Sequence, residues 1–289
     1  MSQVALALRL RGYVDLLKPR LIFLVILSAM TGFYLAQKPG HVASALWSAL
    51  LGITLVSAGS MALNQWLERA EDKKMVRTQK RPLPAGVVTP LEALLMGLGL
   101  SAAGLWVLVA GQHAAAAILA GVTLVLYIVV YTPLKKITLL CTIVGAIPGA
   151  LPTLAGWAAV EWPFSERAWI LFVILYLWQM PHFYAISWIW REDYVRAGFK
   201  MLSVNDPTGQ RVARHILFYV LALLPVSLLP VWIGMAGWVY GAGAVALGFF
   251  FLWRAIQAFG DIQRYARPVF HASIIYLSAL LILLIVDKQ

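Results

Sequence analysis

The sequence predicts an all-α integral membrane protein with about nine transmembrane helices. Apolar residues make up 62% of the 289-residue chain and charged residues only 12%, whereas a soluble domain usually carries about 25% charged residues. Apolar runs of roughly 20 residues, the length that crosses the hydrocarbon layer, recur from end to end. No polar stretch is long enough for a second, soluble domain, so we expect residues 1–289 to form one polytopic domain.

The nine spans follow one another with short connections. In order, we expect them at residues 21–37, 43–64, 89–110, 114–131, 137–160, 167–190, 210–229, 231–253 and 269–286. Before the first span, Arg9 and Arg11 precede a short apolar patch that Lys18-Pro19-Arg20 interrupts, and no small-residue cleavage pattern follows. We therefore expect residues 1–17 to be a cytoplasmic amphipathic lead-in rather than a signal peptide.

The basic residues predict the orientation of these spans. Twenty of the 23 Lys and Arg residues fall on one side of a nine-span arrangement, and only Lys38, Arg167 and Lys288 fall on the other. This asymmetry predicts a cytoplasmic N-terminus, and we expect the membrane to be a bacterial inner membrane. Because the cations are dispersed between apolar spans, the net charge of +11 does not indicate nucleic-acid binding. The lone Cys141 excludes an intramolecular disulfide or a thiolate cluster.

Two polar segments on the predicted cytoplasmic side, 64–88 and 191–209, carry acids together with bases. In the first, Asn64, Glu68 and Asp72 recur every four residues and so share one stripe of a helix. Two carboxylates and an amide oxygen suit Mg²⁺, which completes its shell with water and substrate phosphates. The alternative is a solvated helix end whose acids pair with neighbouring Arg and Lys residues, and the spacing alone leaves both open.

The acid stripe leads directly into a basic loop that holds Arg77, Lys80 and Arg81. Prolines at 82 and 84 and a glycine at 86 exclude a helix there. Arginine forks and lysine ammonium groups bind phosphate, although the loop could equally be a positive-inside anchor without a ligand. Acids and bases together favour a metal–diphosphate site.

At this point several segments resemble the UbiA prenyltransferase superfamily. The run from Asn64 to Gly86 is similar to its first signature, Asn-x-x-x-acid-x-x-x-Asp. Further similar segments are Lys18-Pro19-Arg20, residues 131–136, residues 145–152 with Gly156-Trp157, and Trp178-Gln179-Met180-Pro181-His182-Phe183 followed by Asp193-Tyr194 and residues 198–202. The run from Trp178 resembles the branch that farnesylates haem.

The resemblance implies a UbiA-type helical bundle with a central cavity open to the cytoplasmic side. It also implies transfer of a farnesyl group from farnesyl diphosphate to a vinyl group of haem b, with water addition, giving haem O and diphosphate. Haem b would be a substrate rather than a cofactor, and the bilayer and a haem A synthase or terminal oxidase would be partners. A prenyltransferase acting on an aromatic or quinone precursor, and a small-molecule transporter, are the alternatives.

The expected site residues come from these segments. Catalytic roles are expected for Asn64, Glu68, Asp72, Lys135, His182 and Asp193, with Asn64, Glu68 and Asp72 as Mg²⁺ ligands. Substrate binding is expected for Arg20, Arg77, Lys80, Arg81, Tyr131, Trp178, Phe183, Tyr194 and Lys200. Trp190 and Tyr194 stand where many family members carry a second pair of metal-binding aspartates, so a second metal site lacks its usual acids.

His182 lies near the middle of the sixth span, where an ionisable side chain is a functional hypothesis by default. A neutral imidazole could ligate the haem iron or position a water. The alternative is a core histidine bonded to a neighbouring helix. Asp193 follows eleven residues later, about three helical turns, which predicts that both side chains face one cavity.

Overall fold

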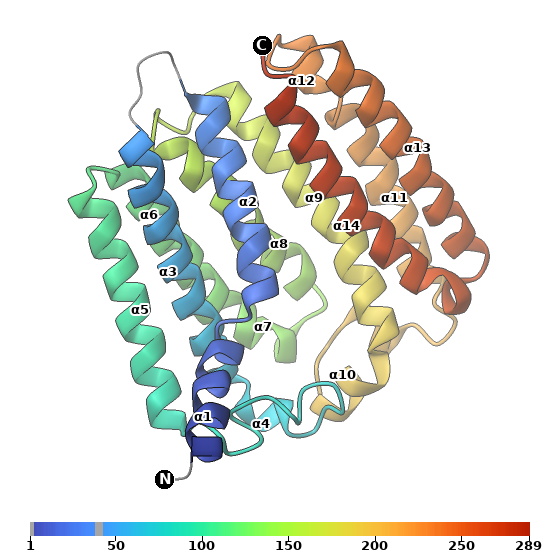
Figure 1. The fold of residues 1–289 in the computed structure, drawn as a ribbon. Helices are drawn as coiled ribbons and strands as arrows, with labels where there is room; N and C mark the ends of the chain where they lie inside the picture. Colours follow the sequence, from blue (N-terminus) through green and yellow to red (C-terminus); the bar gives the residue numbers. More distant parts are fainter. Residues whose placement is uncertain (1–2, 38–42) are drawn as a thin grey trace.

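The computed structural model describes residues 3–37 and 43–289, so Lys38 lies outside the described residues. The helices are α1 (Gln3–Leu16), α2 (Pro19–Ala36), α3 (Ala43–Leu67), α4 (Arg69–Asp72), α5 (Pro90–Ala110), α6 (Ala114–Val125), η1 (Leu126–Tyr131), α7 (Thr132–Ile137), α8 (Cys141–Ala158), α9 (Glu166–Ile189), α10 (Arg191–Ala197), η2 (Leu202–Asn205), α11 (Gln210–Val226), α12 (Leu229–Trp232), α13 (Trp238–Gly260) and α14 (Ile262–Val286). Among these residues, nine helical segments are long and apolar enough to cross a membrane. The chain termini lie at opposite ends of the bundle (Figure 1), as an odd number of crossings requires. The predicted all-α fold and the span count are confirmed.

Several predicted span boundaries were wrong, each for a local reason. The lead-in is helical, and a left-handed Lys18 (φ 51°) before Pro19 separates it from α2. Its Leu6, Leu8 and Leu10 are exposed, and among its leucines whose burial is described only Leu16, at the end of α1, is buried. The eighth span begins at Trp238 instead of residue 231, because the chain turns at Gly234 (φ 62°) after the short α12. The ninth begins at Ile262, where the Asp261 side chain caps the helix.

The interior holds α2 tightly against α8. A Cβ added at Gly32 would lie 2.0 Å from the Thr153 carbonyl oxygen, and one at Gly156 would lie 1.9 Å from that of Ala29. Neither position has room for a side chain, so the two glycines allow the backbones to touch, as small residues do in membrane interfaces. This contact fixes α2 beside α8, and both helices line the cavity described below.

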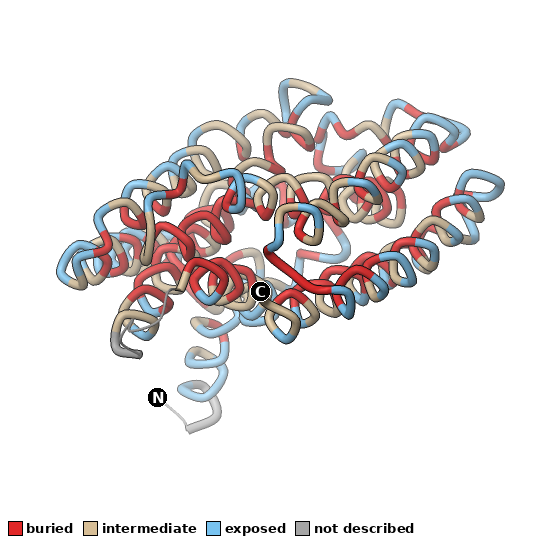
Figure 2. Tube along the Cα trace, turned by 90° about the horizontal axis from the view of Figure 1, so that it is seen from above, coloured by how far each residue is buried: buried red, intermediate tan, exposed pale blue. Residues whose placement is uncertain are grey.

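The outer surface of the bundle is apolar, as expected for contact with lipid. The exposed residues follow the outward sides of the helices, while the buried residues gather inside (Figure 2). Large exposed apolar side chains include Leu95, Trp106, Ile118, Phe249 and Val286. Because lipid tails are as apolar as the side chains, burial of apolar surface does not drive the helices together in the membrane. The arrangement of the helices depends instead on close interior packing and on buried polar contacts. The main concentration of buried charge lies at the end of the bundle that carries α4 and α10.

Candidate active site

The acid stripe forms as predicted at the end of α3. Glu68 joins α3 to α4, and its amide donates to the Asn64 carbonyl (2.9 Å), while the Asp72 amide donates to the Glu68 carbonyl (2.8 Å). These bonds preserve the four-residue spacing across the junction. Asn64, Glu68 and Asp72 are only 1%, 5% and 0% exposed, respectively. The alternative of a solvated helix end is therefore wrong.

Each stripe residue contacts a basic side chain, which comes from the adjoining basic loop for Asp72 and from distant segments for Asn64 and Glu68. Arg81 Nη1 donates to both carboxylate oxygens of Asp72 (2.8 Å each), and Lys135 Nζ lies 2.7 Å from Glu68 Oε1. Lys18 Nζ donates to Asn64 Oδ1 at 3.2 Å. We call these six residues the polar cluster: Lys18, Asn64, Glu68, Asp72, Arg81 and Lys135. Counted by formal charge, three basic side chains face two carboxylates, and this excess favours an anionic ligand.

The polar cluster lowers the pKa of Glu68. Burial would raise the pKa of Glu68, but the adjacent Lys135 ammonium, with Lys18 and Arg81 further away, outweighs it and holds that pKa below its usual value. Glu68 is therefore an anion at neutral pH despite its burial. Lys18 reaches the site because Gln65 Nε2 donates to the Leu16 carbonyl (2.8 Å), which fixes the end of α1 on α3.

The basic loop has the non-helical form that its prolines predict, with a left-handed turn at Gly86 (φ 72°). It turns the Arg81 side chain inward to Asp72 and is tied to the same residue by Thr78 Oγ1, which donates to the Asp72 carbonyl (2.9 Å). Only one terminal nitrogen of Arg81 is used by Asp72, so its other N–H groups remain for a phosphate. Arg77 and Lys80 are exposed on the loop surface.

Lys135 is positioned by an irregular stretch of the fourth span. The π-helix η1 precedes α7, and the Thr132 hydroxyl donates to the Tyr127 carbonyl (2.8 Å) while accepting from Asn64 Nδ2 (3.2 Å). Single π-helical turns inside helices often occur at functional sites. Here the turn brings Lys135 Nζ to 4.5 Å from the centre of the Tyr131 ring and 5.7 Å from that of Phe199.

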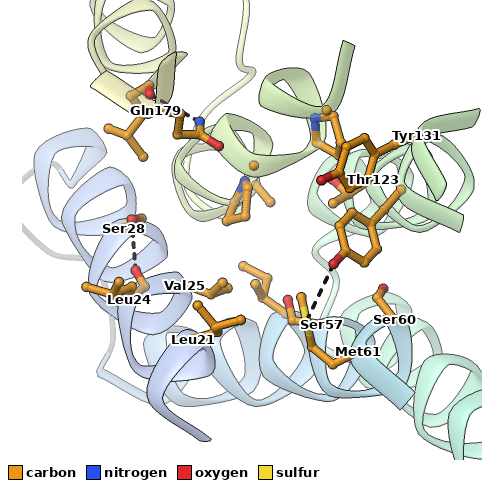
Figure 3. A pocket seen from close by; sticks show the side chains of 18 of the residues that line it. Leu21, Leu24, Val25, Ser28, Ser57, Ser60, Met61, Thr123, Tyr131 and Gln179 are labelled. Carbon is orange, nitrogen blue, oxygen red and sulfur yellow. Dashed lines mark hydrogen bonds between the residues drawn. The ribbon is translucent and has the colours of Figure 1, made fainter. Parts of the chain in front are cut away.

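A cavity of about 230 Å³ extends from this region into the bundle, between α2, α3, the fourth span, α8 and α9 (Figure 3). We call it the central cavity. Its lining is mainly apolar, and the polar exceptions are Ser28, Ser57, Ser60, Thr123, Gln179, His182 and the hydroxyl-bearing Tyr127 and Tyr131. Ser60 precedes Asn64 by one turn of α3, and Tyr131 lines the central cavity while its ring contacts Lys135. The apolar cavity and the polar cluster therefore adjoin.

His182 lies in the wall of the central cavity, between aromatic rings. Its Nδ1 is 2.7 Å from Ser273 Oγ on α14, and its ring is 5.0 Å from the rings of both Trp178 and Phe270. The Trp178 indole nitrogen donates to the Ser273 carbonyl (2.6 Å), so α14 orients both side chains. The structure thus combines the two interpretations of His182, because it is bonded to a neighbouring helix and also faces the cavity.

Asp193 does not share that cavity, so the expectation that it faces the same space as His182 was wrong. The chain bends at Trp190 between α9 and α10, which breaks the helical spacing. Asp193 accepts the amides of Val76 and Arg77 (2.9 and 3.1 Å) and pairs with Arg196. Although burial opposes it, these contacts lower the Asp193 pKa. Asp193 therefore fastens the basic loop to α10.

The remaining predicted residues divide between the cavity, the polar cluster and the surface. Trp178 and Phe183 line the central cavity. Tyr194 packs beside Phe199 (ring centroids 6.1 Å apart), behind Lys135. Lys200 is exposed, and its amide donates to the Lys135 carbonyl (2.6 Å). Arg20 is also exposed, and Lys18 rather than Arg20 contacts the acid stripe.

The sequence prediction missed Lys18, Thr132 and Phe199 as parts of the site. Lys18 lies in the Lys-Pro-Arg segment that resembles the family, directly before a proline. A residue before a proline often departs from helical geometry, and this was the signal in the sequence that could have identified it. Thr132 and Phe199 lie within two of the segments that resemble the family, residues 131–136 and 198–202, but nothing local indicates that they contact Asn64 and Lys135.

Comparison with known proteins agrees with this geometry. The model of the UbiA prenyltransferase family matches residues 25–280. The chain belongs to this family. A protein from Solibacter usitatus named protoheme IX farnesyltransferase is 40% identical to this UbiA family member, over 96% of this chain and 99% of the relative. A protein of the same name from Opitutus terrae is 41% identical, over 96% of this chain and 94% of the relative.

Solved structures share the fold of this UbiA family member. A structure reported for the biosynthesis of digeranylgeranylglyceryl phosphate synthase in membranes has a TM-score of 0.80 at 17% identity, covering 96% of this chain and 98% of that one. A UbiA homologue from Archaeoglobus fulgidus, bound to GPP and Mg²⁺, has a TM-score of 0.68 at 14% identity, covering 94% and 99%. The protein is therefore a multi-pass membrane prenyltransferase with a UbiA-type bundle.

Proposed function

We propose that this enzyme transfers a farnesyl group from farnesyl diphosphate to a vinyl group of haem b, with water supplying a hydroxyl group, to give haem O and diphosphate. The observation that carries the chemistry is the meeting of a cation-rich polar cluster with an apolar cavity. An isoprenoid diphosphate has the same two parts, an anionic head and an apolar tail. The near-full-length similarity to relatives named protoheme IX farnesyltransferase supports haem b as the acceptor and farnesyl as the donated group.

The diphosphate head would bind in the polar cluster. Arg81 offers N–H groups that Asp72 does not use, and Lys18 and Lys135 add two ammonium groups within the same cluster. As the bond to farnesyl breaks, negative charge develops on the diphosphate. Preorganised cations in a water-poor site stabilise that charge more strongly than water does. Lys80 lies on the loop surface, where it would attract the donor.

The donor set is compatible with Mg²⁺. Asn64, Glu68 and Asp72 present hard oxygen ligands, the kind that Mg²⁺ takes together with phosphate oxygens and water. The described residues contain no group of three or more Asp, Glu, His or Cys side chains that would hold a metal alone, so substrate phosphates would complete the shell. Bound there, Mg²⁺ would neutralise part of the diphosphate charge. Lys18, Lys135 and Arg81 now occupy these oxygens, and they would be released toward the phosphates.

The apolar tail would lie in the central cavity, whose aromatic walls suit a cationic intermediate. Tyr127, Tyr131, Trp178 and Phe183 line it, and aromatic faces attract positive charge. The apolar walls exclude bulk water from the allylic cation until the vinyl carbon attacks. A water molecule then adds to the second cation, on the former vinyl group, and becomes the hydroxyl group by releasing a proton to solvent. His182 stands at this wall with Nδ1 held by Ser273, which leaves its other ring nitrogen for a water or for the haem iron.

The uneven distribution of Lys and Arg residues indicates on which side of the membrane the reaction takes place. The polar cluster lies at the end of the bundle whose segments carry most Lys and Arg residues, so we place it on the cytoplasmic side of a bacterial inner membrane. Both substrates would arrive there. A haem A synthase or terminal oxidase would take the farnesylated product.

Product analysis tests the proposal. Purified protein would be incubated with farnesyl diphosphate, Mg²⁺ and, in parallel, haem b or a hydroxybenzoate acceptor, and the extracted pigments would be separated and weighed by mass spectrometry. We expect farnesylated, hydroxylated haem only with haem b. A prenylated hydroxybenzoate would instead indicate a quinone-precursor prenyltransferase, and the absence of any prenylated product, with transport of either substrate, would overturn the assignment.

A further inference from the structure

A second cavity lies beside the basic loop, at the junction of α9 and α14. It encloses about 240 Å³, and its lining includes Arg77, Trp190, Arg267, Phe270 and His271. We call it the basic cavity. A pocket that encloses a whole drug-sized ligand typically measures about 300–1,000 Å³, so the basic cavity would hold one edge of a larger molecule.

The basic cavity contains cations without matching acids. No Asp or Glu is among its lining residues, and within residues 3–37 and 43–289 neither Arg77 nor Arg267 forms an ion pair with a carboxylate. Asp193 bonds to the Arg77 backbone amide and pairs with Arg196 instead. The Arg77 guanidinium lies over the Trp190 ring, 5.5 Å from its centre. Two guanidinium groups are thus left for an anion.

The basic cavity adjoins the central cavity through two aromatic side chains. Phe270 lines the basic cavity, and its ring centre is 5.0 Å from that of His182, which lines the central cavity. On α9, Phe183 faces the central cavity, and Ile186 three residues later lines the basic one. One molecule lying along this wall could reach both spaces.

We propose that the basic cavity binds the carboxylates of the prenyl acceptor, with Arg77 and Arg267 holding the two propionates of haem b. Guanidinium forks match carboxylates geometrically, and the Trp190 and Phe270 rings provide flat apolar faces for a porphyrin edge. In haem b the vinyl groups lie across the ring from the propionates. Anchoring the propionates here therefore directs the vinyl edge toward His182 and the donor. This inference rests on the proposed function and moves Arg77 from donor to acceptor binding.

The test compares haem b with its dimethyl ester, which lacks both negative charges. Each would be titrated by absorption into detergent-solubilised wild type, Arg77→Gln, Arg267→Gln and the control Arg264→Gln. Arg264 is exposed on the first turn of α14 and does not line the basic cavity. We expect wild type and control to prefer the diacid by about tenfold, the scale of one charge-assisted contact. Both lining variants should lose most of that preference while keeping wild-type affinity for the ester and for a non-hydrolysable donor analogue.

Three results would count against the inference. Equal affinity of wild type for diacid and ester would overturn it, as would a preference that survives both lining substitutions. Loss of binding to phosphatidylglycerol vesicles in the variants, with haem binding unchanged, would identify a lipid headgroup site instead. Product formation separates the two proposals: if wild type farnesylates haem b, these results refute only the propionate site, whereas no farnesylated haem refutes the proposed function itself.

Discussion

The contact between Glu68 and Lys135 offers a quantitative test of the polar cluster, because the chain supplies its own control. The Lys135–Glu68 side chains are 11% and 6% exposed, with 2.7 Å between Nζ and Oε1. The neighbouring Lys136–Glu71 pair has a similar separation, 2.5 Å, and its glutamate is also buried (10% exposed), but its lysine is 50% exposed. The same two residue types therefore pair twice, once with both side chains buried and once with a lysine that is half exposed to solvent.

The two pairs should differ in a double-mutant cycle. Lys135→Met leaves a buried carboxylate without its partner, and removing one member of a buried pair costs about 3–5 kcal/mol. The double variant Glu68→Gln/Lys135→Met removes both charges and should be more stable than Lys135→Met alone. We expect a coupling of about 2–3 kcal/mol for this pair and no more than about 1 kcal/mol for Glu71→Gln with Lys136→Met. Reversible unfolding in mixed detergent micelles would measure all variants.

Acid-induced unfolding of the same variants tests the direction in which pH changes the stability that Glu68 contributes. The Glu68 pKa is lower in the folded protein than in the unfolded chain, so the stability it contributes is complete above its unfolded pKa, about 4.3. That contribution is lost as the pH falls through the folded pKa. Glu68→Gln should therefore weaken the acid dependence of unfolding. Equal couplings for both pairs, or an unchanged acid dependence, would refute the account of a charged, buried cluster.

Three further predictions concern the site and the topology. Asp72→Asn keeps the shape but removes a charged ligand, so turnover should fall at least a hundredfold and need more Mg²⁺ while the protein still inserts and folds; unchanged turnover at limiting Mg²⁺ would contradict the metal assignment. His182→Ala should weaken haem binding and spare binding of a donor analogue, whereas Arg81→Ala should do the reverse, as paired titrations would show; wild-type haem affinity and product yield in His182→Ala would make the histidine a packing residue. Reporters fused after Arg81 and after Lys200 should lie in the cytoplasm and a C-terminal reporter outside, and a cytoplasmic C-terminus would contradict nine spans.

The fold was predictable because its signals are local. Apolar runs of membrane-spanning length gave the nine spans, and the four-residue spacing of Asn64, Glu68 and Asp72 placed them on one stripe. The prolines of the basic loop likewise exclude a helix by their own geometry. Errors in span boundaries arose at left-handed residues such as Gly234, where the chain turns without leaving the apolar pattern.

The basic partners of Asn64 and Glu68 were not predictable, because these contacts join segments that are distant in the sequence. Lys18 meets Asn64 across 46 residues, and Lys135 meets Glu68 across 67. Helical periodicity carries no information about such pairs, since it reports only which face a side chain shares with its near neighbours. The placement of Asp193 failed for the same reason: eleven residues make three turns only if the helix is unbroken, and the chain bends at Trp190.

The central claim is that a farnesyl group and a hydroxyl from water are both added to haem b. Incubation of the purified protein with haem b, deuterated farnesyl diphosphate and Mg²⁺ in ¹⁸O-labelled water would test it in one mass spectrum. The account predicts a haem product that carries the deuterated farnesyl group and one ¹⁸O atom. A product with the label on another acceptor, or a farnesylated haem without ¹⁸O, would contradict it.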